Sequence, residues 1–149
     1  MRYYLDTEFD GLGGNLLSLA LVPADGGEEL YLAWPRNDCC DWVTLHVIPI
    51  ITTQGAFPLA ANPDMWPGEI EAYFKRTFDG YPIEVIADWP DDVGYLSRLL
   101  ITGPGKMVDI PGIVFRVARV DAYPTNLPHA VQHNALWDAR ALRYRILGR

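Results

Sequence analysis

The order of the extended segments constrains the fold of this chain more than any other feature of its sequence. Three strand-like segments come first, and short glycine-containing turns separate them. Gly11-Leu12-Gly13-Gly14 follows the first segment, and Asp25-Gly26-Gly27, a strong hairpin signal, follows the second. The sequence therefore predicts an antiparallel meander of three strands, at Arg2–Phe9, Leu16–Val22 and Glu29–Ala33.

Helices and strands alternate in the rest of the chain. An ambiguous apolar run from Asp41 to Ile51 is interpreted as a short helix ending near Pro49, and the Pro-rich segment Gly55–Pro67 as a long loop. Apolar spacing then predicts helices at Pro67–Phe78, Val93–Leu100 and Asn134–Leu147, and strands at Ile83–Ala87 and Phe115–Val120. We expect one α/β domain over residues 1–149, with a mixed sheet of three antiparallel and then parallel strands flanked by helices.

Composition limits the class of protein. Half of the 149 residues are hydrophobic and 21% are charged, which is typical of a folded globular domain. No apolar run approaches the roughly 18 residues that cross a bilayer, and no signal-peptide pattern precedes the first strand, so we expect a cytoplasmic protein without a membrane partner. The net charge of −7 argues against nonspecific binding to a duplex, although divalent cations would bring positive charge of their own. Adjacent cysteines do not form an ordinary structural disulfide, so Cys39 and Cys40 are expected to be reduced.

Two carboxylates belong to the first strand. Asp6 and Glu8 are two residues apart, and residues with this spacing point to the same side of a strand. Two like charges near a sheet interior repel each other and lose their hydration, and a divalent cation between them offsets both costs. Carboxylate oxygens suit Mg²⁺ or Mn²⁺. Taken alone, the pair is more simply explained as a strand end that faces solvent, and Asp10 is expected to lie at the surface.

Two further polar groups fall where a strand ends or a helix begins, which is where sites form in open α/β sheets. Asp88-Trp89-Pro90-Asp91-Asp92 follows one strand, and His133-Asn134-Ala135-Leu136-Trp137-Asp138 opens the last helix. Five positions on a helix rotate side chains well apart, so His133 must precede the helix if it shares a site with Asp138. There Asp138 would hold a metal and His133 would act as a general base. Taken alone, His133 is more simply a surface loop residue.

These motifs together resemble the DEDDh branch of the DEDD superfamily of 3′–5′ exonucleases, which are RNase H-like. The family pattern corresponds here to Asp6-Thr7-Glu8, Asp92-Val93-Gly94-Tyr95-Leu96, and His133 through Asp138, spread over nearly the whole chain. The Asp-Thr-Glu-Phe start and the Asp-Trp-Pro-x-Asp segment are similar, more narrowly, to the small bacterial polyadenylate-preferring exoribonucleases of the RNase AS group. Many members carry Asn where this chain has Asp88. We assign Asp92 as the metal ligand, with Asp88 as the alternative and Asp91 at the surface.

The resemblance implies a two-metal mechanism that removes nucleotides from the 3′ end of RNA, from a single strand or a 3′ overhang, without a covalent enzyme intermediate. His133 would be the general base, and two Mg²⁺ or Mn²⁺ ions would be held by Asp6, Glu8, Asp92 and Asp138. Candidate substrate-binding residues beside the motifs are Phe9, Leu12, Asp88 and Trp89. The aromatic residues among them could stack on terminal bases or simply fill the core.

Other functions remain open at this point. A 3′–5′ DNA exonuclease of the proofreading or repair type is the nearest alternative, because the motifs do not reveal contacts to a 2′-hydroxyl. A non-catalytic RNase H-like binding module and a metal-independent acidic interaction protein belong to other classes. Related small exonucleases are commonly homodimers, and the aromatic residues that could form such an interface are Trp34, Trp42, Phe57 and Trp66. Arginines concentrate next to the His-x4-Asp motif, at Arg140, Arg143, Arg145 and Arg149.

Overall fold

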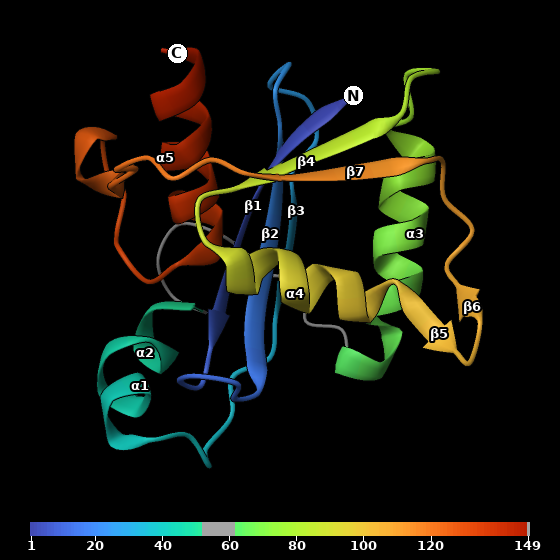
Figure 1. Ribbon diagram of the computed structural model, residues 1–149. Helices are drawn as coiled ribbons and strands as arrows, with labels where there is room; N and C mark the ends of the chain where they lie inside the picture. The colour runs from blue at the N-terminus through green and yellow to red at the C-terminus, as the bar shows by residue number, and fades with distance from the viewer. Residues whose placement is uncertain (52–61, 149) are drawn as a thin grey trace.

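A mixed five-stranded sheet with helices on its two faces forms the centre of the computed structural model, which describes residues 1–51 and 62–148 (Figure 1). The strand order in the sheet is β3-β2-β1-β4-β7. The elements in chain order are β1 (Arg2–Phe9), β2 (Leu16–Pro23), β3 (Leu30–Ala33), α1 (Asp41–His46), α2 (Ile48–Ile51), η1 (Pro63–Met65), α3 (Trp66–Arg76), β4 (Ile83–Ala87), α4 (Pro90–Leu99), β5 (Ile101–Gly103), β6 (Lys106–Met107), β7 (Ile113–Val117), η2 (Pro124–Asn126) and α5 (Ala135–Leu147). Within the described ranges, every helix is too short or too polar to cross a bilayer.

The sheet has the mixed arrangement that the sequence predicted. β1 pairs antiparallel with β2, and β2 pairs antiparallel with β3. On its other side β1 pairs parallel with β4, and β4 pairs parallel with β7. β1 is therefore the central strand, with hydrogen-bonded neighbours on both sides.

Alternation along β1 directs its side chains to two different cores. Tyr3 and Leu5 pack with α3 and α4, whereas Tyr4 packs with α5 on the opposite face of the sheet. Because side chains alternate along a strand, Asp6 and Glu8 belong to the face that α5 covers. The helix that supplies the last acidic motif thus lies over the strand that supplies the first, as Figure 1 shows.

Several predicted boundaries were wrong. The segment predicted as one helix ending near Pro49 forms two short helices, α1 and α2. α4 begins at Pro90, earlier than predicted, since proline is well suited to the first turn of a helix, where its missing N–H has no partner to lose. The strand predicted to reach Val120 ends at Val117, because its partner β4 ends opposite that residue at Ala87. The hairpin of β5 and β6 was not predicted.

The predicted aromatic interface needs one correction. Trp66 is only 1% exposed and packs in the core at the start of α3, because it shares a helical face with Ile70 and Phe74. Trp34 and Trp42 are exposed, and Phe57 lies outside the described residues. The end of the predicted Pro-rich loop forms η1 and the first turn of α3, and residues 52–61 are likewise outside the described part.

Candidate metal centre

A cleft of about 650 Å³ opens where β1 ends, α4 begins and α5 begins. All three acidic motifs contribute to its wall, although they are far apart in the sequence. The predicted site residues that line it are Asp6, Glu8, Phe9, Trp89, Asp92, His133 and Asp138. The turn residue Leu12 does not line the cleft, and Asp88 lines a neighbouring hollow.

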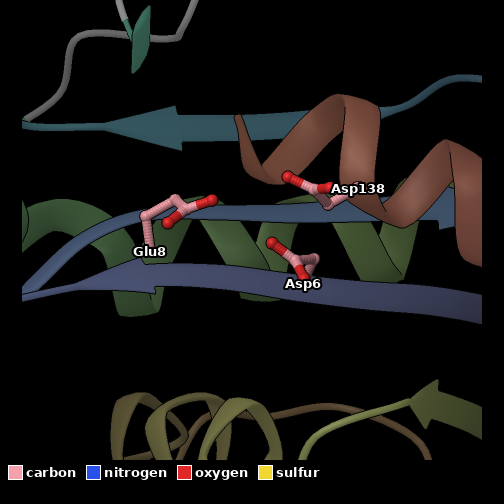
Figure 2. A group of neighbouring side chains, drawn as sticks. All are labelled: Asp6, Glu8 and Asp138. Atoms are coloured by element: carbon pink, nitrogen blue, oxygen red, sulfur yellow. The ribbon is translucent and has the colours of Figure 1, made fainter. Parts of the chain in front are cut away.

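The carboxylates form two groups that share Asp6. Asp6, Glu8 and Asp138 each offer an oxygen atom, and these atoms lie within 4.8 Å of one another. Figure 2 shows the Asp6 and Glu8 side chains on β1 and Asp138 on the neighbouring helical turn, with all three carboxylates gathered in one region. The same distance limit joins oxygen atoms of Asp6, Asp88 and Asp92. Each group could hold a metal ion, and Asp6 could serve both.

Asp92 presents an unpartnered oxygen atom to this cluster. Its side chain is buried at the start of α4, and its Oδ1 accepts hydrogen bonds from the backbone N–H of Thr7 at 3.1 Å and from the Thr7 hydroxyl at 2.5 Å. Its Oδ2 is buried without a hydrogen-bond partner. A buried carboxylate oxygen without a partner is costly, and a cation between Asp92 and its acidic neighbours would satisfy it. The residues present therefore fit a hard divalent ion.

The start of α5 holds Asp138 in place. Asn134 is buried and caps the helix, since its side-chain oxygen accepts from the backbone N–H of Trp137 at 3.3 Å. In return, the backbone N–H of Asn134 donates to Asp138 Oδ2 at 3.2 Å. His133 directly precedes this cap with a φ of 62°, a left-handed conformation uncommon outside glycine. His133 thus precedes α5, as the His-x4-Asp spacing required.

Burial and mutual repulsion make the ionised cluster unfavourable in the absence of a cation. Burial raises the pKa of Asp6 and of Glu8 well above the usual carboxyl range, and the charges of neighbouring carboxylates raise both further. Burial also raises the pKa of Asp92 and of Asp138 to about 7, although hydrogen bonds from neighbouring residues oppose it. The pKa of Asp88 is raised by burial too. A divalent cation would reverse this balance by favouring the charged forms.

His133 has the surroundings of a neutral base. Its ring meets the Trp42 ring edge to face, with 5.1 Å between the centroids, and Trp42 in turn contacts His46. Burial lowers the pKa of His133 below its ordinary value of 6.5, and the nearby His46 lowers it further. At neutral pH the imidazole is therefore uncharged and has a nitrogen atom free of its proton.

The candidate substrate-binding residues differ in their exposure. Phe9 is half-buried, with its ring 4.8 Å from that of Tyr95, whereas Leu12 is 96% exposed on the turn after β1. Trp89 is exposed at the edge of the cleft. The two aspartates expected at the surface are only partly exposed, and each accepts a hydrogen bond from a neighbouring segment or residue. Asp10 accepts from the backbone N–H of Cys40, and Asp91 accepts from the indole N–H of Trp89.

Some residues of the site were missed in the sequence. Thr7 holds Asp92, and Asn134 holds Asp138; the position of Asn134 just before an apolar helix is a recognisable capping signal. Arg119, which stands over the ring of Trp89, has no comparable signal.

The arginines near the C-terminus do not line the cleft, as far as the structure describes them. Arg140 pairs with Glu29, with 2.5 Å between Nη2 and Oε2, and Arg143 donates to the carbonyl of Ala24. Arg145 is exposed on α5, and Arg149 is outside the described residues.

Comparison of the chain with models of protein families and with curated protein sequences finds no match to either.

Proposed function

We propose that this protein is a metal-dependent 3′–5′ exoribonuclease with an RNase H-like fold. The observation that carries the proposal is the pair of carboxylate groups that share Asp6; their members line one cleft, except Asp88, which lines the hollow beside it. Two adjacent oxygen-rich positions suit the two-ion hydrolysis of a phosphodiester. A central strand that is antiparallel to β2 and parallel to β4 also supports the fold that the motif resemblance implies.

The residues that would hold Mg²⁺ or Mn²⁺ are Asp6, Glu8, Asp88, Asp92 and Asp138. When bound, the ions supply Lewis-acid stabilisation of the phosphate charge and make water a usable nucleophile at neutral pH. The choice between Asp92 and Asp88 as the third ligand need not be exclusive, because both carboxylates approach Asp6. The free Oδ2 of Asp92 favours it as a direct ligand.

The protein side chains then have distinct tasks. His133 takes the proton of the attacking water, since its depressed pKa keeps it neutral at pH 7. Thr7 fixes Asp92 through two hydrogen bonds, so that the free oxygen atom keeps one direction. Asn134 does the same for Asp138. Rigid ligands of this kind reduce the reorganisation needed when charge develops on the phosphate.

We infer RNA as the substrate from the narrower sequence resemblance to small bacterial exoribonucleases. Phe9, Leu12 and Trp89 are the candidate contacts for the terminal bases, since stacking on an aromatic ring and packing on an exposed leucine are tolerant of sequence. Trp89 has one ring face covered by Arg119, so a base would stack on the other face.

The experiment is a degradation assay on 5′-labelled substrates. Single-stranded RNA, the matching DNA and a duplex with a 3′ overhang are incubated with Mn²⁺ or Mg²⁺, and in parallel with excess EDTA. We expect a ladder that shortens from the 3′ end of RNA, needs metal, and is lost in Asp6→Ala and His133→Ala. Asp64→Asn, which removes an exposed carboxylate of η1 that lines neither the cleft nor the hollow beside it, is the matched control and should retain activity.

The outcomes separate the alternative functions. Faster degradation of DNA than of RNA would favour the DNA exonuclease. Metal-dependent binding of RNA without cleavage, under both metals, would indicate a non-catalytic binding module. If the protein neither binds nor cleaves these substrates, the remaining alternative is the metal-independent acidic interaction protein.

A further inference from the structure

Negative charge at this cleft would repel an anionic substrate. The chain has a net charge of −7, and the candidate metal centre concentrates carboxylates. Bound cations would attract the phosphate being cleaved, but the next phosphate of the strand lies beyond them and needs a positive group of its own. Many basic side chains are already committed to carboxylates, in ion pairs of 2.5 to 2.9 Å that involve Arg2, Arg36, Lys75, Arg76 and Arg140.

Arg119 is not one of these paired residues, and it lies beside the cleft. It lines a hollow of about 320 Å³ that shares Trp89, Ala122 and Tyr123 with the cleft. Asp88 also lines this hollow, so the hollow lies on the side of Asp6 where Asp88 and Asp92 gather. Arg119 forms no ion pair with a residue of the described ranges. Its charge opposes the rise that burial causes in the pKa of Asp88, without an ion pair between them, and its guanidinium has no hydrogen-bond acceptor among the described residues, so its N–H groups are available to a ligand.

The guanidinium of Arg119 lies over an aromatic ring that is itself held in place. Its carbon Cζ lies 4.4 Å from the centroid of the Trp89 ring. The indole N–H of Trp89 donates to Asp91 at 2.8 Å, which fixes the ring at the start of α4. A guanidinium that stacks through its face keeps its N–H groups at the edge for hydrogen bonds, and this planar edge suits two oxygen atoms of a phosphate.

Other charges in the hollow limit what it can bind. Asp121 and Asp88 also line it, so a free anion would meet repulsion from two carboxylates as well as attraction from Arg119. A phosphate that belongs to a strand already anchored at the metal centre is brought there by its own chain. Attachment to the strand provides a high effective concentration that overcomes weak local attraction.

We propose that Arg119, stacked on Trp89, binds the backbone phosphate next to the one being hydrolysed, on the side of the strand that remains after cleavage. Arg119 is then a specificity-determining residue that makes the enzyme prefer an oligonucleotide to a single nucleotide ester. This inference rests on the proposed nuclease function. It adds to that function the direction in which the retained strand leaves the cleft, over Trp89 and past Tyr123.

The test compares two substrates that differ in the second phosphate. One is a 5′-labelled RNA of ten nucleotides, and the other is thymidine 5′-p-nitrophenyl phosphate, which has only the phosphate to be cleaved. In Arg119→Ala we expect kcat/KM on the decamer to fall on the order of tenfold or more, since a charge-assisted contact is lost. Any loss on the ester should be at least tenfold smaller, by the same reasoning.

A lysine variant and a salt series make the test specific. Arg119→Lys should recover part of the activity on the decamer, because the charge remains but the planar fork does not. The slope of log kcat/KM against log salt should become shallower in Arg119→Ala by about 0.7, the value for one phosphate contact on a single strand. Arg116→Ala removes an exposed arginine of β7 and is the matched control, with wild-type slope and activity expected.

The outcomes distinguish failure of the inference from failure of the function. If wild type cleaves both substrates and Arg119→Ala behaves on the decamer as Arg116→Ala does, the inference is overturned and the nuclease function stands. Equal losses on decamer and ester would also overturn it, since Arg119 would then act at the reacting phosphate or on the fold. If wild type cleaves neither substrate with Mn²⁺ or Mg²⁺, the proposed function itself fails and the inference falls with it.

Discussion

Replacement of Asp92 by Asn should stabilise the metal-free protein at alkaline pH, contrary to the usual effect of changing a buried residue. Asp92 is 2% exposed, and burial raises its pKa from 3.8 to about 7. The native state therefore keeps the proton of Asp92 over a range in which the unfolded state has released it. Stability falls as pH rises between these two values, since the native state binds more protons there.

The size of the effect follows from this pKa. A rise from 3.8 to about 7 corresponds to roughly 4 kcal/mol of lost stability above pH 7 as an upper limit. This pKa already reflects the hydrogen bonds from Thr7, which favour the charged form of Asp92, and the oxygen atom of Asn can accept both of them. We therefore expect Asp92→Asn to raise the free energy of unfolding by up to about 4 kcal/mol at pH 8, and to leave it nearly unchanged near pH 4.

The assay is urea unfolding followed by far-UV circular dichroism, in EDTA, at several pH values from 4 to 8. Equal m-values for the two proteins would show that the extent of unfolding is the same. Asp121→Asn removes an exposed carboxylate and serves as the control for a general change in net charge. If Asp92→Asn is no more stable than wild type at pH 8, or if its advantage does not grow with pH, burial does not disfavour the ionised form of Asp92 in the folded protein.

Three further predictions concern the metal centre and its supports. Calorimetric titration with Mn²⁺ should give two ions for wild type, one for Glu8→Gln and none of comparable affinity for Asp6→Asn, because Asp6 belongs to both carboxylate groups; two retained ions in Asp6→Asn would contradict the sharing. Asn134→Ala should lower the free energy of unfolding by about 1 kcal/mol through loss of the helix cap. It should also weaken Mn²⁺ binding in the same titration, because the start of α5 holds Asp138. Unchanged affinity would show that the cap does not position the site. Gly14→Ala should lower the thermal midpoint, since its Cβ would lie 1.8 Å from the backbone oxygen of Asp10, and a midpoint equal to that of wild type would show that the turn can rearrange freely.

The sequence predicted the meander and the three acidic motifs because these depend on local patterns. The alternation along β1 and the glycine turns are properties of short segments, and so is the spacing that puts His133 ahead of its helix. The ends of strands that are set by a partner strand could not be predicted from local sequence. The end of β7 depends on where β4 stops, which no pattern within residues 113–120 contains.

The parts of the site missed in the sequence are those made by tertiary contacts. Thr7 holds Asp92 across a separation of 85 residues, and Arg119 meets Trp89 from a different segment of the chain. Trp66 was expected to contribute to an apolar interface because it lies in the predicted Pro-rich loop, whereas its helical register with Ile70 places it in the core. Register outweighs neighbouring composition when a large aromatic ring begins a helix.

The reciprocal bonds at the start of α5 tie assembly of the centre to docking of this helix. Asp138 is at once a candidate ligand and the acceptor for the backbone N–H that precedes its own helix, so it reaches its place only when α5 has docked. That helix is the last element in the described ranges, and its apolar residues complete one of the two main cores. A nascent or truncated chain that lacks α5 would contain Asp6, Glu8, Asp88 and Asp92 but could not form the group that includes Asp138. Loss of α5 would therefore remove one of the two candidate metal positions and, with it, the proposed exonuclease activity.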